Sequence, residues 1–399
     1  MLVRTYRPSY RHIWPIDPNS NRPPENWQGW PDGKKFALVL THDVDTQQGL
    51  EKCLRLADLE ERLGFRSSFN FVAEDFRLSG ALLKNLKSRG FEVGSHGIHH
   101  KNPFSSPQHF QIQAAKINQY LAERQAVGFR SPSMYHNLDM IHDLNIEYDA
   151  STFDTDPFEP QPDGVGTIFP FWIPGRNGRP GYVELPYTLP QDFLLFVLMR
   201  EKGIDIWKQK LDWIVQNGGM ALFISHPDYI DFNNTPHYER YSVRYYEEFL
   251  TYIKKNYEGQ YWHALPRDMA KFWTANYKAS RPVQKKSRHI CMLAYSFYES
   301  DNRIMRYADA LQERGDSVDV IALKSENMPT CERLNSVNVY RIQKRIINEK
   351  AKAAYLCKLL VFLLRSTVFL TRKHMKHRYD LIHVRSEEHT SELQSRQSI

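Results

Sequence analysis

Two short clusters of acidic and histidine side chains have the residue types and spacing of a hydrolytic metal site. Asp43 and Asp45 follow the apolar run 36–40 and are two residues apart, so in an extended chain both face the same side. His96 and His100 are four residues apart, and on a helical turn both rings would share a face and could chelate one ion. Asp45 and the two histidines would leave one coordination position for water, and Asp43 could act as general base. The alternative for the aspartates is a helix N-cap and a turn.

Two further polar residues are candidates for roles beside this cluster. Arg130 follows a short apolar run, and a buried arginine can orient a nearby aspartate and keep it ionised. Alone, it fits a surface residue before a turn equally well. His226 ends the apolar run 221–225 and is a candidate general acid, with a structural role as the alternative. The acidic loop 149–156 fits turn and cap chemistry at least as well as a function.

The segments that must position these residues alternate between strand and helix patterns. Short apolar runs predict strands at 36–42, 67–73, 91–96, 127–130, 146–151, 182–186, 221–226 and 261–265. Helical patterns are found at 49–63, 81–89, 107–124, 205–217 and 242–256. This alternation predicts an α/β fold, and a closed or partly closed barrel rather than an open sheet. The candidate residues follow the strands, at the carboxyl ends where parallel barrels have their active sites.

The chain of 399 residues is long enough for a large α/β barrel plus a smaller unit. Residues 1–34 contain six prolines and are expected to form an extended arm, followed by the barrel over 35–278 and a polar, basic linker over 279–288. Residues 289–384 begin with a strand–helix–strand pattern, the start of a partial Rossmann-like unit. This unit lacks a GxGxxG motif, so dinucleotide binding is not indicated. The chain has 41% hydrophobic and 25% charged residues, and this composition excludes a collagen-like or largely disordered protein.

Positive charge is concentrated late in the chain, whose formal net charge is +7. In 351–378 basic residues are interleaved with apolar ones and no acidic residue occurs. This pattern indicates either a basic amphipathic helix on an anionic membrane face or an ordinary helix with a solvated basic face. The segment is too apolar for a typical nucleic-acid arm, so we expect no nucleic-acid partner. No secretory signal, no long apolar run and no CxxC pair is visible, so we expect a cytoplasmic protein with free thiols, associated at most peripherally with the inner membrane face.

Taken in order, the clusters resemble the motifs of polysaccharide deacetylases of carbohydrate esterase family 4. The fold of that family, called the NodB-homology fold, is a distorted (β/α)7 barrel, and the resemblance covers roughly residues 35–275. The segment THDVD is similar to the first motif of the family, T-F-D-D, in a shifted form. The resemblance places the catalytic base at Asp43 and the metal-binding aspartate at Asp45, because Val44 cannot bind a metal.

The second and third motifs of the family have partial matches. His96 and His100 match H-S/T-x-x-H, with Gly97 at the position of the hydroxyl residue. Arg130 and Pro132 match R-x-P, but the usual aromatic-glycine continuation is absent. By this resemblance the two histidines bind the metal, Arg130 orients the base, and Pro132 lines the substrate pocket.

The fifth motif, L-x-x-H, is similar to the end of the run 221–226. The resemblance makes His226 the acid that protonates the leaving amine, and Leu222 or Ile224 the apolar wall near the acetyl methyl group. The fourth motif has no clear match, although Asp149 or Asp154 could take its place.

The resemblance implies an enzyme, a metal-dependent N-deacetylase of an N-acetylated sugar in a polysaccharide or glycolipid precursor. It implies one divalent ion per chain, Zn²⁺, held by Asp45, His96 and His100. Two alternatives stay open: a hydrolase of another amide or formamide, and a non-catalytic glycan-binding barrel. The second alternative is motivated by Val44, Gly97 and the incomplete third motif.

The last third of the chain resembles a different family. Residues 289–323 look like the opening of a family 4 glycosyltransferase of the GT-B type, and the segment YDLIHV follows the apolar-basic region as a strand does in that family. Residues 385–399 are polar and rich in Ser, Gln and Glu, and we interpret them as a non-native tail. The resemblance implies a truncated deacetylase–glycosyltransferase fusion whose incomplete second unit exposes a sheet edge. Glycosyl transfer is not expected from it.

Overall fold

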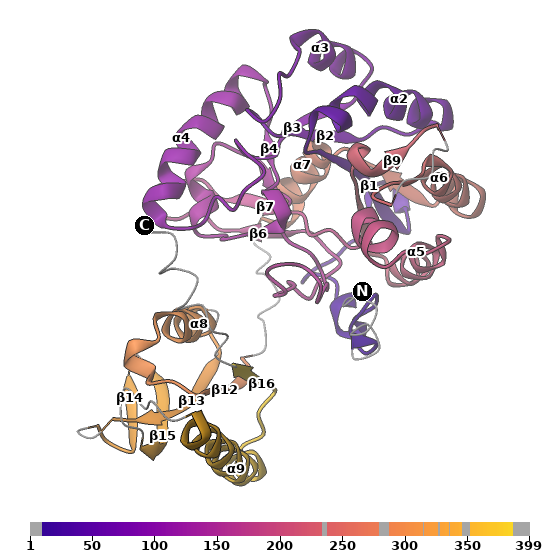
Figure 1. Ribbon diagram of the computed structural model, residues 1–399. Coiled ribbons are helices and arrows are strands. Elements are labelled where there is room, and N and C mark those ends of the chain that lie inside the picture. The colour runs from indigo at the N-terminus through magenta and orange to yellow at the C-terminus, as the bar shows by residue number, and fades with distance from the viewer. Residues whose placement is uncertain are drawn as a thin grey trace. The chain divides into compact units, whose positions relative to one another are not determined.

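The computed structural model describes residues 10–233, 238–278, 287–313, 315–325, 328–334, 336–344 and 352–385. The chain divides into two compact units, Met1–Gln284 and Lys285–Ile399, and each has its own sheet and buried core (Figure 1). Most of the predicted linker, residues 279–286, lies outside the described residues, as does the predicted tail from residue 386 onward.

The first unit is built on a nine-stranded sheet in the order β11-β1-β2-β3-β4-β5-β7-β6, with β8 paired to β1. The strands are β1 (Phe36–Val44), β2 (Ser68–Phe71), β3 (Glu92–Ser95), β4 (Gly128–Phe129), β5 (Tyr148–Asp149), β6 (Phe171–Ile173), β7 (Tyr182–Glu184), β8 (Met220–Ser225) and β11 (Tyr261–His263). Only β6 runs antiparallel to its neighbour within this sheet. The sheet curls into a partly closed barrel, so the predicted α/β fold class is confirmed.

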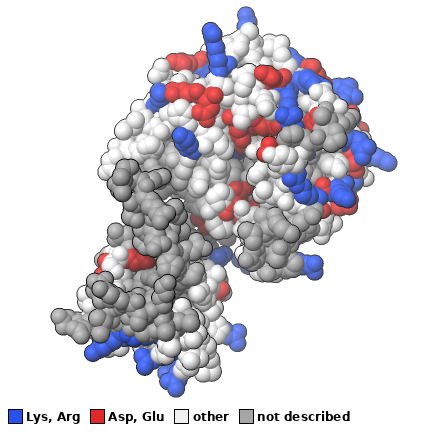
Figure 2. All heavy atoms as spheres, in the orientation of Figure 1, with Lys and Arg blue, Asp and Glu red and all other residues white. Residues whose placement is uncertain are grey.

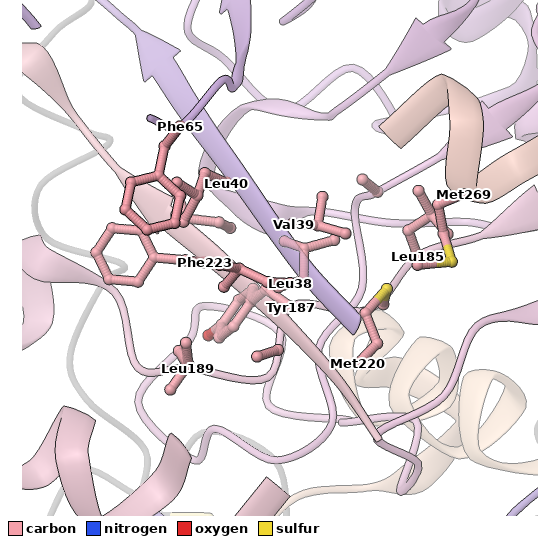
Figure 3. Packing of buried hydrophobic residues seen from close by; sticks show 14 of the residues in the cluster. Leu38, Val39, Leu40, Phe65, Leu185, Tyr187, Leu189, Met220, Phe223 and Met269 are labelled. Carbon is pink, nitrogen blue, oxygen red and sulfur yellow. The ribbon is translucent and has the colours of Figure 1, made fainter. Parts of the chain in front are cut away.

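The central strand β1 has three strand partners. It pairs along Ala37–His42 with β8, and on its other side Phe36–Leu38 pairs with β11 and Thr41–Val44 pairs with β2. Every residue of β1 is buried. A strand buried on both faces has no need for alternating polar residues, which explains the continuous apolar run FALVL. Figure 3 shows part of this core, where side chains of β1 lie beside Met220 and Phe223 of β8.

Helices lie around the outside of this sheet (Figure 1). They are α2 (Gln47–Leu63), α3 (Gly80–Ser88), α4 (Pro107–Glu123), α5 (Asp205–Asn217), α6 (Val243–Tyr257) and α7 (Pro266–Tyr277). The ends of α2 follow from local chemistry, because the Thr46 hydroxyl accepts a hydrogen bond from the Gln48 amide and Gly64 adopts the left-handed conformation at φ 85°. Sequence analysis did not identify β6, α7 or the π-helix Phe193–Leu198.

Short elements complete the first unit. They are the 3₁₀ turns η2 (Pro18–Asn21), η3 (Pro31–Gly33), η4 (Pro132–Met134), η5 (Met140–Asp143) and η7 (Pro227–Tyr229), and the paired strands β9 (Ile230–Asp231) and β10 (Tyr241–Ser242). Residues 10–34 of the predicted arm pack on the barrel. The indole N–H of Trp30 donates to the Gly218 carbonyl at 2.7 Å, and the Gln28 amide donates to the Tyr277 hydroxyl at 3.1 Å.

The second unit contains a five-stranded sheet in the order β14-β15-β13-β12-β16. Its elements are β12 (His289–Ala294), the 3₁₀ turn η8 (Tyr298–Ser300), α8 (Asn302–Glu313), β13 (Ser317–Lys324), β14 (Cys331–Leu334), β15 (Val337–Lys344), α9 (Lys352–Lys376) and β16 (Leu381–Arg385). Four strands are parallel, and only β14 is antiparallel to its neighbour. Met292 of β12 belongs to the core under α8, whereas Leu293 belongs to the core under α9. This is the order and layering of half a Rossmann fold, as predicted.

One face of α9 remains apolar and exposed. Leu360, Leu364, Val368 and Met375 have exposed fractions of 52, 69, 52 and 74%. Phe362, on the opposite face, is only 2% exposed. Lys and Arg side chains lie on the surface formed by this helix (Figure 2). Among the described residues, no helix is long and apolar enough to cross a membrane.

The buried Glu92 of β3 makes the stability of the first unit dependent on pH. Its carboxylate accepts hydrogen bonds from the Tyr148 hydroxyl at 2.8 Å and the Arg267 amide at 3.0 Å, and burial raises its pKa from 4.5 to about 7. Between pH 4.5 and about 7, the Glu92 carboxyl group is therefore mostly protonated in the folded state and mostly ionised in the unfolded chain. Stability contributed by this group falls as pH rises from 4.5 through 7, by about 2 kcal/mol between pH 5 and 8.

Glu92→Gln should remove this part of the pH dependence. All eight tryptophans lie between residues 14 and 273, so urea unfolding followed by tryptophan fluorescence reports on the first unit alone. The unfolding free energy of the variant should fall less between pH 5 and 8 than that of the parent, by about 2 kcal/mol. Parallel pH curves for the two proteins would contradict this prediction.

Candidate metal centre

Asp45, His96 and His100 come together although they follow two different strands. β1 ends at Val44 and β3 at Ser95, and the loops after them carry the three side chains. One ligand atom of each residue lies within 4.8 Å of those of the other two. Nε2 of His96 is 3.4 Å from Oδ1 of Asp45, and Nε2 of His100 is 3.6 Å from Oδ2 of Asp45. Two imidazole nitrogens and a carboxylate oxygen suit zinc, with a fourth position open.

The surroundings of these side chains fit a cation. Oδ1 of Asp45 is buried and has no hydrogen-bond partner among the described residues, and a buried charge without compensation is costly. The Nδ1–H of His96 donates to the Arg130 carbonyl at 3.0 Å, which leaves the Nε2 lone pair on the side of Asp45. A hydrogen bond of this kind fixes the ring orientation and tautomer of a ligating histidine. The unsatisfied carboxylate oxygen and the oriented imidazole therefore fit a bound divalent ion.

The expectation of a helical turn between the two histidines was wrong. Residues 98–101 form a bend, and Gly97 just before it has φ 79° in the left-handed region. A Cβ atom at position 97 would lie 3.0 Å from Cγ of Pro132, so Pro132 packs directly against this loop. The rings of His96 and His100 approach to a centroid distance of 5.6 Å through the loop conformation, not through a shared helix face.

Asp43 lies on β1 in a buried network with Arg130. Its Oδ1 accepts hydrogen bonds from Nδ2 of Asn70 at 2.9 Å and from a guanidinium nitrogen of Arg130 at 3.1 Å. The same guanidinium nitrogen donates to the Thr41 hydroxyl at 2.7 Å. Burial raises the pKa of Asp43, but the positive charge of Arg130 and nearby imidazoles outweigh it, so the pKa lies below its ordinary value. Asp43 is therefore ionised at neutral pH and can accept a proton.

His226 follows β8 and is held by Asp192. Its Nδ1–H donates to one oxygen of Asp192 at 2.7 Å, and its backbone amide donates to the other at 2.8 Å. The Tyr241 hydroxyl also donates to Asp192, at 2.9 Å. Burial lowers the pKa of His226, but the charges of Asp192, Asp45 and Asp43 overcome this and raise the pKa to about 10. The imidazole is thus protonated at neutral pH.

Sequence reasoning missed Asp192. It lies 34 residues before His226 and directly before the π-helix Phe193–Leu198, so no local motif connects the two residues. The two stand-ins considered for the fourth motif have other partners. Asp154 forms a buried ion pair with Lys210 at 2.5 Å, and Asp149 accepts a hydrogen bond from the Ser151 hydroxyl at 2.7 Å.

Leu222 and Ile224 lie on β8 in register with Val39 and Thr41 of β1. Because side chains alternate along a strand, both share a face with the position of His226. Both are fully buried, so in this structure they pack in the core. Their role as the wall of an acyl pocket stays a prediction.

No protein-family model and no curated protein matches this sequence. Among solved structures, it is similar to Puue allantoinase, with a TM-score of 0.50 and 16% identity over 65% of this chain and 96% of that one. A protein from Mycobacterium smegmatis assigned as a polysaccharide deacetylase gives a TM-score of 0.48 and 17% identity, over 65% of this chain and 97% of that one. One from Pseudomonas aeruginosa PAO1 with the same assignment gives 0.48 and 15%, over 62% and 94%. At such identities the likeness concerns the fold, and the similarity to the allantoinase supports the barrel architecture of the first unit.

Proposed function

We propose that the first unit is a metal-dependent hydrolase of the polysaccharide-deacetylase type, which removes the acyl group from an N-acetylated sugar in a polysaccharide or glycolipid precursor. The observation that carries this proposal is the convergence of Asp45, His96 and His100 around a buried, unsatisfied carboxylate oxygen. The paired Asp43–Arg130 and His226–Asp192 side chains supply a base and an acid for the same reaction. No other group of described residues combines a candidate metal-ligand cluster, a base and an acid.

Asp45, His96 and His100 would hold the ion, with Zn²⁺ as the expected metal. When bound, it supplies Lewis-acid polarisation and lowers the pKa of water. Asp43 takes a proton from the attacking water, and Arg130 keeps Asp43 ionised and fixed in orientation.

His226 completes the proposed reaction as the acid. The water oxygen forms a bond to the acyl carbon, the C–N bond breaks, and the Nε2 proton of His226 goes to the leaving amine nitrogen. During the whole reaction Asp192 accepts a hydrogen bond from Nδ1–H of His226, so the ring presents Nε2 to the substrate. The products are the free amino sugar and acetate.

Acetate release from N-acetylglucosamine oligomers by the zinc-loaded full chain tests the proposal. Formylated amino sugars and allantoin belong in the same assay, because the chemistry suits other amides and an allantoinase shares the fold. Turnover of the acetylated sugar alone supports deacetylation. Turnover of another amide only would favour a hydrolase of that amide or formamide, and sugar binding without any turnover would favour a glycan-binding barrel.

For the second unit we propose a GT-B-like origin and a peripheral position at the inner membrane face, in a cytoplasmic protein. The parallel order β15-β13-β12-β16 supports the first part of this proposal. The exposed apolar face of α9 and its basic side chains support the second, because both complement an anionic lipid surface.

Charge reversal on α9 tests membrane association. In the full chain, Arg365→Glu combined with Arg372→Glu should reduce co-sedimentation with phosphatidylglycerol vesicles at least about tenfold, since each basic residue contributes roughly 1 kcal/mol. The parent should sediment less as salt is raised. Lys101→Glu combined with Lys271→Glu changes the net charge equally on the first unit and should leave sedimentation unchanged. Equal losses in both double variants would refute a specific role of α9.

A further inference from the structure

The carboxylate of Asp228 holds the backbone that carries Asp45, although the two residues are 183 positions apart. Its Oδ2 accepts a hydrogen bond from the Asp45 amide at 3.2 Å. Its Oδ1 accepts from the amide of Thr46 at 2.9 Å and from the hydroxyl of Thr46 at 2.5 Å. Asp228 is only 8% exposed. Three donors beside the proposed metal ligand thus converge on one buried carboxylate.

The segment that carries Asp228 also carries the proposed acid. His226 lies two residues earlier, and the turn η7 (Pro227–Tyr229) joins them. From α2, Nζ of Lys52 donates to the carbonyls of Pro227 at 3.0 Å and Asp228 at 2.9 Å. The start of α2 therefore binds both the side chain and the main chain of this turn.

The first turn of α2 has no side chain where the Asp228 carboxylate lies. A Cβ atom at Gly49 would be 2.2 Å from Oδ2 and 2.6 Å from the carboxyl carbon of Asp228. Glycine in a helix costs up to about 1 kcal/mol relative to alanine. At position 49 the protein accepts this cost, because the absence of a side chain leaves room for the Asp228 carboxylate.

We propose that Asp228 is a positioning residue that sets the Asp45 carboxylate in place relative to His226, so that the metal ligand and the acid are held as one rigid unit. The inference rests on the proposed function, because it assigns Asp228 a role only if Asp45 binds a metal. Asp228 acts through the backbone of residues 45 and 46 and not by contact with the ion or the substrate.

Cobalt binding to the full chain tests this role, because visible absorption of bound Co²⁺ reports both affinity and coordination geometry. Asp228→Ala should weaken Co²⁺ binding about 10–100-fold and alter the spectrum, as loss of an outer-shell partner does. Asp228→Asn should act in the same direction, since an amide offers one acceptor oxygen to donors on both sides. Asp231→Asn is the matched control: Asp231 is equally buried, accepts from the Asn233 amide at 2.9 Å, and should leave binding unchanged.

Gly49→Ala tests the same contact from the opposite side. The added methyl group displaces the Asp228 carboxylate, so Co²⁺ binding should weaken although alanine favours the helix. In the Asp228→Ala background the space is free, and Gly49→Ala should cause no further loss. A non-additive pair of this kind is the signature of one shared contact.

The outcomes separate the inference from the proposed function. Parent-like affinity in Asp228→Ala, or fully additive losses in the double variant, would overturn the inference while the metal site stands. Should Asp228→Ala fail to fold by tryptophan fluorescence, Gly49→Ala decides, and parent-like binding there overturns the inference. A parent that binds no Co²⁺ overturns the proposed function and the positioning role with it.

Discussion

Asp45→Ala and His96→Ala should each abolish stable zinc binding by the full chain, whereas the parent should hold about one zinc ion per molecule. Each substitution removes one of the three proposed ligands that the described residues supply. His96→Ala also removes the imidazole that the Arg130 carbonyl orients. Elemental analysis after dialysis, followed by zinc titration with a competing chelator, measures the effect.

A buried histidine outside the centre provides the control for this experiment. His142 is 7% exposed, and its Nε2 is bonded to the Pro174 carbonyl at 2.9 Å. His142→Ala should retain the parental zinc content. A parent without zinc that also fails to take it up on titration would show that the shifted THDVD motif is not a working site.

Asp43→Asn should lower kcat for deacetylation about 10²–10⁴-fold while the zinc content stays that of the parent. The amide has nearly the size of the carboxylate and can still accept a hydrogen bond from Arg130, but it cannot take up a proton. Steady-state kinetics on acetylated glucosamine oligomers, with zinc measured on the same samples, gives the result.

Asp154→Asn is the matched control for the loss of a buried charge. Asp154 is paired with Lys210 at 2.5 Å much as Asp43 is paired with Arg130. Among the described residues, no hydrogen bond or ion pair joins Asp154 to the candidate metal centre. This variant should lose stability and keep kcat within about twofold of the parent, because it leaves base and acid intact. Equal loss of kcat in both variants would mean that destabilisation, not removal of a base, explains the effect at Asp43.

The sequence was informative where chemistry and secondary structure are local. The apolar run before Asp43 defines a buried strand, and the periodicity of 49–63 with its glycine stop defines a helix that extends only two residues further, to Gln47. The spacing of His96 and His100 correctly predicted that the two rings lie close together, but the helical turn from which this was argued is absent. Gly97 is left-handed and lies against Pro132 of the turn η4, a neighbour 35 residues later in the chain that spacing cannot reveal.

Long-range partners were beyond the reach of local patterns. Asp192 contacts His226 across 34 residues of sequence, and Asp228 contacts the Asp45 amide across 183 residues. An isolated aspartate can have many roles, so its residue type alone does not identify one. The helix α7 was missed because Pro266, at its start, marks a turn as readily as a helix N-terminus. Tertiary packing decides between these possibilities.

The three-partner pairing of β1 has a consequence for synthesis on the ribosome. This strand is made early, but β8 and β11, which complete its two sides, are encoded near the end of the first unit. Although β2 and β8 are made earlier, the nascent chain must therefore leave the edge of Phe36–Leu38 that faces β11 unpaired until Tyr261–His263 has emerged. We therefore expect growing chains of this protein to present FALVL as a binding site for chaperones, and we expect translation pauses before residue 261 to increase aggregation more than pauses after it.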